Sequence, residues 1–217
     1  MLLITPPGVY RAQADTELLL AALEEEPLPS GAAVLDIGTG SGALAVAAAR
    51  RGAAVTAVDV SWPALASAVL NGALHGRRIR ARHGDLLRPV VGRRFDLVLA
   101  NPPYVPAPTP LSSARGAARA WDAGPDGRQL VDRICAHAPA FLRPGGVLLL
   151  VHSDLCGVER TCAALRATGL RAAVVARVTQ PFGPVMRARA EWFERQGLIE
   201  PGRREEELVV IRGVRPR

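Results

Sequence analysis

The chain contains no lysine, so all 27 of its basic residues are arginine. Alanine is abundant at the same time, and this usage is typical of a GC-rich coding bias as much as of a selected binding face. The formal net charge of +7 and the pI of about 10.7 suit a nucleic-acid or ribosome-associated partner. Because the arginines are scattered, the charge keeps such a partner open as an alternative and does not establish it.

Cysteine is also scarce, and its spacing excludes two classes of protein. Cys135, Cys156 and Cys162 form no CxxC pair and have no histidine at zinc-ligand spacing. This pattern argues against a disulfide scaffold and against a zinc site. We therefore predict buried, reduced thiols and no metal centre.

Long apolar runs are missing as well. No stretch approaches the ~20 residues of a membrane span. The first residues, 1–7, lack the basic region of a signal peptide and are too short to be one. We expect a cytoplasmic protein with no membrane partner.

What is present is a regular alternation of short apolar runs and helical patterns. Alternation of this kind predicts an α/β fold with a mainly parallel sheet. The predicted strands are 32–37, 53–58, 79–83, 95–100, 147–151, 170–178 and 208–211, and the predicted helices are 15–23, 43–51, 61–74, 129–141, 154–168 and 185–194. Asp15 or Thr16 is expected to cap the first helix, and Ser61 the third.

The stretch that carries most functional information is Asn101-Pro102-Pro103-Tyr104, directly after the predicted strand 95–100. Two prolines cannot continue a sheet, because neither has an N–H group to donate. The backbone carbonyl of Pro102 is therefore free beside the side-chain carbonyl of Asn101. Two such acceptors can bind both hydrogens of a planar –NH2 group, and the ring of Tyr104 offers a face for a flat amide or base. The sequence predicts a binding site for an sp2 amino nitrogen.

A glycine-rich turn follows the first predicted strand and opens a helix. Gly38, Gly40 and Gly42 permit a sharp turn and a close approach to a nucleotide-like ligand at the sheet edge. The same spacing also fits a dinucleotide fingerprint. Asp36, on the strand just before the turn, would repel a pyrophosphate but suits a cationic ligand such as S-adenosylmethionine.

Two further acidic residues follow the next strands. Asp59, 21 residues after Gly38, can accept both ribose hydroxyls of a nucleoside, which fits S-adenosylmethionine and NAD equally. Asp85 is placed to accept an adenine amino hydrogen, and Leu86 to cover the ring.

Taken together and in this order, these motifs resemble class I S-adenosylmethionine-dependent methyltransferases. The segments Gly8-Val9-Tyr10, Asp15-Thr16 and Trp121-x-x-Gly124-x-x-Gly127-Arg128 narrow the resemblance to the HemK-like glutamine N5-methyltransferases. Within that family the chain resembles the short branch without a separate N-terminal helical domain. The resemblance covers about residues 10–214.

The resemblance implies a Rossmann-like seven-stranded sheet of order 3-2-1-4-5-7-6 with strand 7 antiparallel. It implies an irregular segment and helix over 1–30 that cover the cofactor site, and a methyltransferase domain over 31–217 with a substrate loop at about 105–120 and a helical insertion at about 181–197. The implied catalytic residues are Asn101, Pro102 and Tyr104. The implied cofactor contacts are Thr16, Asp36, Gly38, Gly40, Gly42, Asp59, Asp85, Leu86 and Asn101. The implied substrate contacts are Tyr10, Pro103 and Trp121.

The expected reaction is S-adenosylmethionine-dependent methylation of a glutamine amide in a protein such as a release factor, and relatives work with a small zinc-binding activator subunit. Three alternatives remain open. An N-methyltransferase of adenine in nucleic acid, or of a small-molecule or peptide amine, needs the same amino site. An NAD-dependent oxidoreductase fits the glycine turn but gives Asn101-Pro102-Pro103-Tyr104 no role. A non-enzymatic cofactor-binding scaffold would bind the cofactor without any acceptor.

Overall fold

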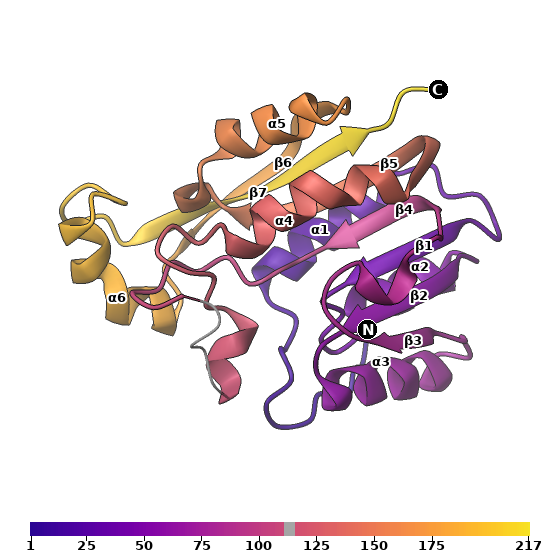
Figure 1. Cartoon of the computed structure of the whole chain (residues 1–217). Coiled ribbons are helices and arrows are strands. Elements are labelled where there is room, and N and C mark those ends of the chain that lie inside the picture. Colours follow the sequence, from indigo (N-terminus) through magenta and orange to yellow (C-terminus); the bar gives the residue numbers. More distant parts are fainter. Residues whose placement is uncertain (111–115) are drawn as a thin grey trace.

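The computed structural model describes residues 1–110 and 116–217. The described strands form one seven-stranded sheet of order β3-β2-β1-β4-β5-β7-β6. Strand β7 is antiparallel to both β5 and β6, and the other pairs are parallel. The predicted α/β fold, strand order and antiparallel β7 are confirmed. Figure 1 shows the sheet with helices on both of its faces.

The elements follow the apolar runs closely. The strands are β1 (Ala33–Ile37), β2 (Ala54–Asp59), β3 (Arg80–His83), β4 (Phe95–Ala100), β5 (Leu142–Ser153), β6 (Arg171–Pro181) and β7 (Glu205–Val214). The α-helices are α1 (Ala14–Glu24), α2 (Ala43–Arg50), α3 (Trp62–Leu74), α4 (Gln129–His137), α5 (Val158–Ala167) and α6 (Pro184–Arg195). Short 3-10 turns lie at Arg88–Val90, Gly116–Ala120, Ala138–Phe141 and Asp154–Cys156.

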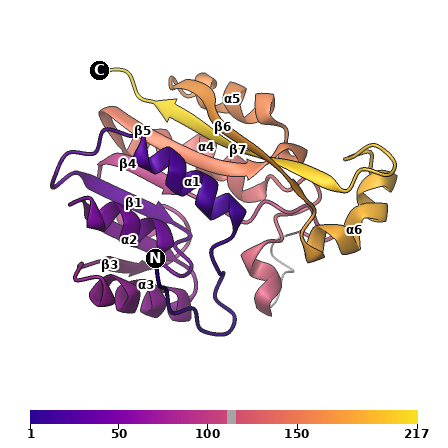
Figure 2. The same ribbon diagram turned by 180° about the vertical axis from the view of Figure 1, so that it is seen from behind.

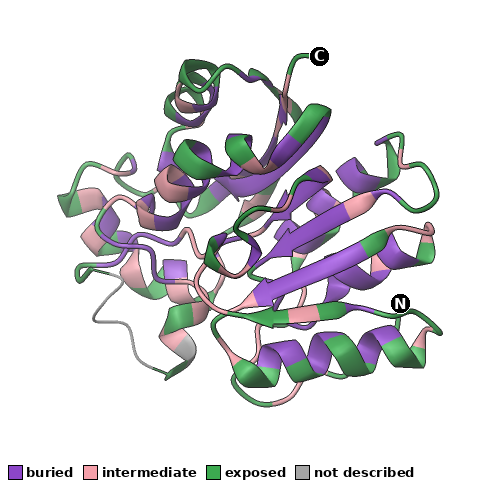
Figure 3. Ribbon diagram, turned by 45° about the vertical axis from the view of Figure 1, so that its right-hand side comes forward, coloured by how far each residue is buried: buried purple, intermediate pink, exposed green. Residues whose placement is uncertain are grey.

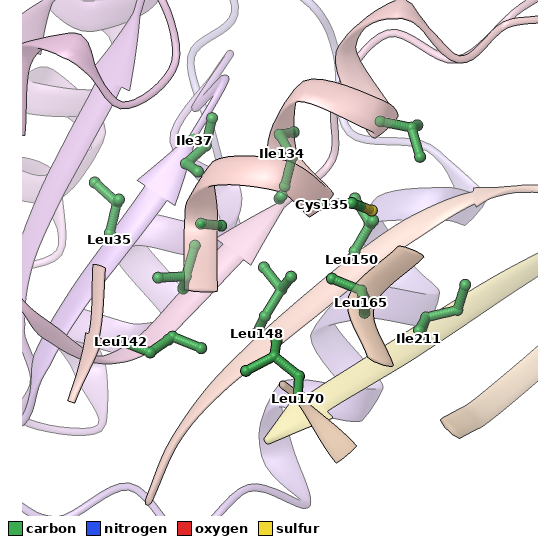
Figure 4. Close-up of a cluster of buried hydrophobic side chains, with 14 of the residues drawn as sticks. Leu35, Ile37, Ile134, Cys135, Leu142, Leu148, Leu150, Leu165, Leu170 and Ile211 are labelled. Carbon is green, nitrogen blue, oxygen red and sulfur yellow. The ribbon is translucent and has the colours of Figure 1, made fainter. Parts of the chain in front are cut away.

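Alternate residues of the central strands point to two separate cores. Leu148 and Leu150 of β5 pack in one cluster with side chains of α4 and α5, whereas Leu149 and Val151 pack in a second cluster with α1 and α2. Figure 4 shows the first cluster, in which Ile134 of α4 faces the strands. Because the central strands β1, β4 and β5 are covered on both faces, they are mostly apolar and lack the polar–apolar alternation of half-exposed strands.

Helix α1 lies on the face of the sheet opposite α4, where Figure 2 shows it in front of β5 and β7. Its predicted side-chain cap is wrong. Gln13 occupies the N-cap position without a side-chain hydrogen bond, and Asp15 and Thr16 lie inside the first turn, where both are buried. The predicted cap of α3 is confirmed, since Ser61 accepts a hydrogen bond from the Ala64 backbone N–H at 3.3 Å.

The edge strand β3 is more exposed than the strands at the centre of the sheet. The residues of β3 are exposed or intermediate, while those of β4 and β5 are mostly buried (Figure 3). Helix α6 follows β6 and lies beyond the carboxyl ends of the parallel strands (Figure 1). The predicted substrate loop at about 105–120 contains residues 111–115, which lie outside the described residues.

Candidate active site

A cavity of about 840 Å³ opens at the carboxyl edge of the sheet. Its wall comes from the N-terminal segment, the turns after β1, β2, β3 and β4, the 116–121 segment, β7 and the start of α6. Of the residues implied as catalytic, cofactor or substrate contacts, those that line it are Tyr10, Gly38, Gly40, Asp59, Asp85, Leu86, Asn101, Pro102, Pro103, Tyr104 and Trp121. Thr16, Asp36 and Gly42 do not line the cavity, although each lies one or two positions along the chain from a residue that does.

The segment after β4 leaves the sheet and pairs with the 121–124 segment. The Val105 N–H donates to the Trp121 carbonyl at 2.8 Å, and the Ala107 N–H donates to the Gly124 carbonyl at 2.9 Å. Gly127 supports this arrangement from behind, since a Cβ there would lie 2.3 Å from the Tyr104 carbonyl oxygen. Only glycine allows the two backbones to approach so closely, and the close approach holds Pro103 and Tyr104 against the cavity.

Asp15 is a buried hydrogen-bond acceptor at the centre of this wall. Its Oδ2 accepts from the hydroxyls of Tyr10 at 2.7 Å and Tyr104 at 3.1 Å. Burial, with the charge of Asp15, raises the pKa of both tyrosines well above the ordinary value. Both phenols therefore remain protonated donors at neutral pH, and Asp15 fixes the two rings relative to each other.

The side-chain amide of Asn101 has one orientation because of Thr16. The Thr16 hydroxyl donates to Asp15 Oδ1 at 3.1 Å, so its oxygen is left to accept a hydrogen bond. The Asn101 Nδ2 group donates to that oxygen at 3.1 Å. The Oδ1 atom of Asn101 is therefore directed away from Thr16, as an acceptor for another molecule.

The glycine turn is held to the end of β2 by Asp59. The Gly40 N–H donates to Asp59 Oδ2 at 3.0 Å, and the Ser61 N–H donates to Oδ1 at 2.9 Å. Gly38 and Gly40 have φ angles of +69° and +53°, which favour glycine. Burial raises the pKa of Asp59, and the backbone hydrogen bonds oppose this shift. Each carboxylate oxygen keeps a lone pair for a further donor from the cavity.

Asp36 and Gly42 act within the protein interior in this structure. Asp36 is fully buried, accepts a hydrogen bond from the Thr39 hydroxyl at 2.6 Å, and has its pKa raised by burial to about 7. Gly42 precedes α2 with φ +82°, and a Cβ there would lie 2.6 Å from Ala68 Cα. The glycine is required for packing of α2 against α3.

Asp85 and Leu86 form the wall after β3. The Asp85 carboxylate pairs with Arg133 of α4, a partner that the sequence did not indicate. Leu86 has φ +48° and is the only non-glycine residue with positive φ among the described residues. This conformation is unfavourable for a branched side chain, so its presence at a cavity wall marks a position set by the site.

Helix α6 closes the opposite wall. Phe182, Met186 and Phe193 form a small core with Val105, against which Tyr104 and Trp121 pack. Arg189 of α6 donates to the Pro106 carbonyl at 3.0 Å and lies 2.7 Å from the Asp122 carboxylate. The helix is therefore attached to both segments that carry the substrate contacts implied for this wall.

Three charged residues have roles in the site that the sequence did not indicate. Arg128, which the sequence motif names without a role, is buried at 1% exposure and donates to the Cys156 and Gly157 carbonyls, which ties the 124–128 segment to the turn after β5. Asp15 was read as a helix cap. Glu206 is the middle residue of three successive glutamates, yet it is buried at 3% exposure and lines the cavity. Its position in alternation with the exposed Glu205 was the only available signal.

The described residues also bear on metal sites, cysteine pairs and membrane spans. No group of three or more His, Cys, Asp or Glu side chains there is arranged to hold a metal ion. All three cysteines are buried and unpaired, as predicted. No described helix is both long enough and apolar enough to cross a membrane.

Comparison with known proteins agrees with this geometry. Residues 1–110 match the model of the methyltransferase small domain family. The chain is 34% identical over 181 residues to a Methanocaldococcus jannaschii protein assigned as a protein N5-glutamine methyltransferase, and the alignment covers 83% of this chain and 90% of that protein. It is 39% identical over 158 residues to the release factor glutamine methyltransferase of Geobacter sulfurreducens, covering 68% of this chain but 54% of that enzyme. The chain thus spans about half the length of this bacterial relative.

Among solved structures, the E. cuniculi Mtq2–Trm112 complex, responsible for methylation of the eRF1 translation termination factor, contains a chain of the same fold. The TM-score is 0.67 at 23% identity, with 96% of this chain and 99% of that chain covered. This likeness extends the fold agreement over the whole sheet. With the family match over the glycine turn and the Asn101 segment, and with a relative covered almost entirely, the chain belongs to the methyltransferase small domain family.

Proposed function

We propose that this protein transfers the methyl group of S-adenosylmethionine to the side-chain amide nitrogen of a glutamine in a protein, with a translation release factor as the acceptor. The observation that carries the proposal is the orientation of Asn101, whose Oδ1 is left as an acceptor at the cavity beside Pro102. The relatives named as glutamine methyltransferases support the choice of acceptor.

The residues of the cavity fit S-adenosylmethionine. The turn at Gly38 and Gly40 allows close approach of a ligand, because an added Cβ would meet nothing nearer than 3.5 Å there and the space belongs to the cavity. Asp59 would hold the ribose hydroxyls with its remaining lone pairs, and Leu86 would cover the adenine. Asp85 keeps one oxygen beside its contact with Arg133. The buried Asp36 has one carboxylate oxygen with no hydrogen-bond partner among the described residues, and its charge would favour a cationic ligand.

The N-terminal segment would cover the bound cofactor. Gly8, Val9 and Tyr10 line the cavity, and Tyr10 lies over the glycine turn within 3.5 Å of the place where a Gly40 Cβ would be. Thr16 would act through Asn101, because its hydroxyl contacts that amide. This assigns residues 1–30 to the ligand-covering part of the site and residues 31–217 to the methyltransferase domain.

The acceptor amide is a poor nucleophile, because its lone pair is delocalised into the carbonyl group. Bound S-adenosylmethionine supplies an electrophilic methyl group on a positively charged sulfur. Asn101 Oδ1 and the Pro102 carbonyl would accept both N–H hydrogens of the acceptor, which fixes the plane of the amide and directs its lone pair out of that plane. The same two dipoles would stabilise the positive charge that develops on nitrogen, and the methylated amide, strongly acidic while it carries the extra proton, would release that proton to solvent. The Tyr104 ring, fixed by Asp15, would support the face of the amide, with Pro103, Tyr10 and Trp121 bounding it.

Partners follow from the same proposal. A small zinc-binding activator subunit is an expected partner, supported by the fold likeness to a chain found in complex with Trm112. The release factor named for the bacterial relative acts in translation, so we place the activity in the cytoplasm. Nucleic acid is the second choice of acceptor.

The proposal is tested by incubating the protein with S-adenosylmethionine carrying a tritiated methyl group and a lysate of the source organism. Label that is lost to protease and maps to a glutamine by mass spectrometry supports it. Label lost to nuclease instead would assign the protein to the base methyltransferases. In the same assay N101A should lower kcat by at least ~10-fold and leave cofactor affinity within about 3-fold, because one hydrogen bond to the developing charge is lost. Equal loss of both would make Asn101 part of the cofactor wall.

A further inference from the structure

Glu206 is a buried carboxylate in the cavity wall that the proposed chemistry does not use. It lies on β7, opposite Gln180 of β6, and its exposure is 3%. Oε1 accepts a hydrogen bond from Gln180 Nε2 at 3.0 Å. Oε2 is buried and has no hydrogen-bond partner among the described residues.

No neighbouring group among the described residues satisfies that oxygen. The Ser153 hydroxyl faces the carboxyl group and lowers its pKa as a hydrogen-bond donor, but its one hydrogen is also shared with Asp154 Oδ1 at 3.4 Å, and no described donor meets Oε2 in hydrogen-bond geometry. None of the ion pairs in the described part of the chain includes Glu206. Leaving a buried carboxylate oxygen unpaired costs folding free energy, so a fold retains such a group where a ligand completes it.

The place of Glu206 in the cavity is on the acceptor side. Its charge acts on Tyr104 and Tyr10, the two rings fixed by Asp15, and contributes to their raised pKa values. The cavity is also lined by Gln180, which pairs with Glu206 across β6 and β7, and by Val185 and Met186 of α6, the helix that follows β6. Glu206 therefore lies in the part of the cavity formed by the tyrosines and α6. The glycine turn, Asp59 and Leu86 lie at the ends of β1, β2 and β3.

We infer that Glu206 Oε2 accepts a hydrogen bond from an N–H group of the acceptor peptide next to the methylated side chain, so that Glu206 is a specificity-determining residue for the acceptor. The inference rests on the proposed function and names a contact of that site. The acceptor supplies the missing donor, and Gln180 holds the carboxylate in place for it. A hydrogen bond to a charged acceptor is stronger than one between neutral groups.

The test compares E206Q with E207Q. E206Q keeps the shape and the Oε1 contact but places an NH2 donor where the free oxygen was. Glu207 is the neighbour on the other strand face, where it pairs with Arg177 and does not line the cavity, so E207Q removes the same charge outside the site. E206D, which keeps the charge but withdraws it by one methylene, serves as a second variant if E206Q folds poorly.

Steady-state kinetics use the acceptor that the wild type labels in the lysate experiment, and S-adenosylmethionine affinity is measured by calorimetry. We expect E206Q to raise the acceptor KM ~10- to 100-fold, with kcat and cofactor affinity within about 3-fold of wild type and with E207Q unchanged. An unchanged acceptor KM in E206Q, or equal losses in kcat, KM and cofactor affinity, would overturn the inference and leave the proposed function standing. Label that enters a nucleobase contradicts the proposed function, and it also overturns the peptide contact assigned to Glu206.

Discussion

The orientation of one side-chain amide depends on a residue 85 positions earlier in the sequence. An asparagine amide can present either its oxygen or its nitrogen, and the two differ only in hydrogen-bond role. Asp15 takes the Thr16 proton, Thr16 then accepts from Asn101 Nδ2, and Asn101 Oδ1 becomes the exposed acceptor. The motif after β4 therefore supplies the amide, but the first turn of α1 decides what that amide offers.

This chain of hydrogen bonds predicts the effect of changes at Thr16. T16V keeps the shape but removes the oxygen that accepts from Asn101, so the amide is free to rotate and kcat should fall by ~10-fold, the effect of about 1.4 kcal/mol. T16S retains the hydroxyl and should stay within about 3-fold of wild type. The measurement is single-turnover methyl transfer at saturating cofactor, with calorimetry for cofactor binding. A T16V protein whose only defect is weaker cofactor binding would show that Thr16 serves the cofactor directly.

At the scale of elements, sequence reasoning located nearly every helix and strand. Buried parallel strands such as β4 and β5 are continuous apolar runs, and Ser61 marks the start of α3 by its cap. Contacts between distant elements could not be predicted in this way. Arg128, Asp15 and Glu206 are charged residues whose burial depends on carbonyls, phenols and amides contributed by other parts of the chain.

The sequence predicts helix α6, but its contribution to the site depends on where the helix packs. Its aromatic residues pack in a separate small core with Val105. Arg189 adds polar contacts to the Pro106 carbonyl and to Asp122. The helix therefore sets the distance between the segment after Asn101 and the segment after Trp121.

Removing the polar contacts that Arg189 makes from α6 should change acceptor binding more than it changes the free energy of unfolding. R189A loses a hydrogen bond and a half-buried ion pair, and we expect the acceptor KM to rise ~5- to 20-fold while cofactor affinity stays near wild type. R195A is the matched control on the same helix, because Arg195 is exposed and its one ion pair with a described residue is the 3.9 Å contact with Glu191. The measurement is steady-state kinetics at varied acceptor concentration. An R189A enzyme with unchanged KM would mean that the apolar core alone fixes α6.

At the scale of the whole molecule, charge is unevenly distributed. Residues 60–84 contain no acidic side chain but carry Arg77, Arg78, Arg80 and Arg82, and no ion pair of the described residues involves these four arginines. They lie at or before the exposed edge strand β3, whereas the cavity carries the buried carboxylates of Asp15 and Glu206 and the half-buried carboxylate of Asp59. Asp59 suits the ribose of either cofactor, but the other carboxylates of the cavity favour a cationic ligand and hydrogen-bond donors over the pyrophosphate group of NAD.

Ligand binding to the cavity should stabilise the entire fold, because the wall is drawn from both ends of the chain and from the ends of most strands. S-adenosylmethionine at about 100 times its Kd should add about 2.7 kcal/mol to the free energy of unfolding. For a domain of this size that corresponds to a rise in Tm of roughly 5–10 °C. NAD at the same concentration should give no shift, since the buried acids repel its pyrophosphate. Thermal unfolding followed by circular dichroism measures both, and stabilisation by NAD but not by S-adenosylmethionine would contradict the cofactor assigned to this site.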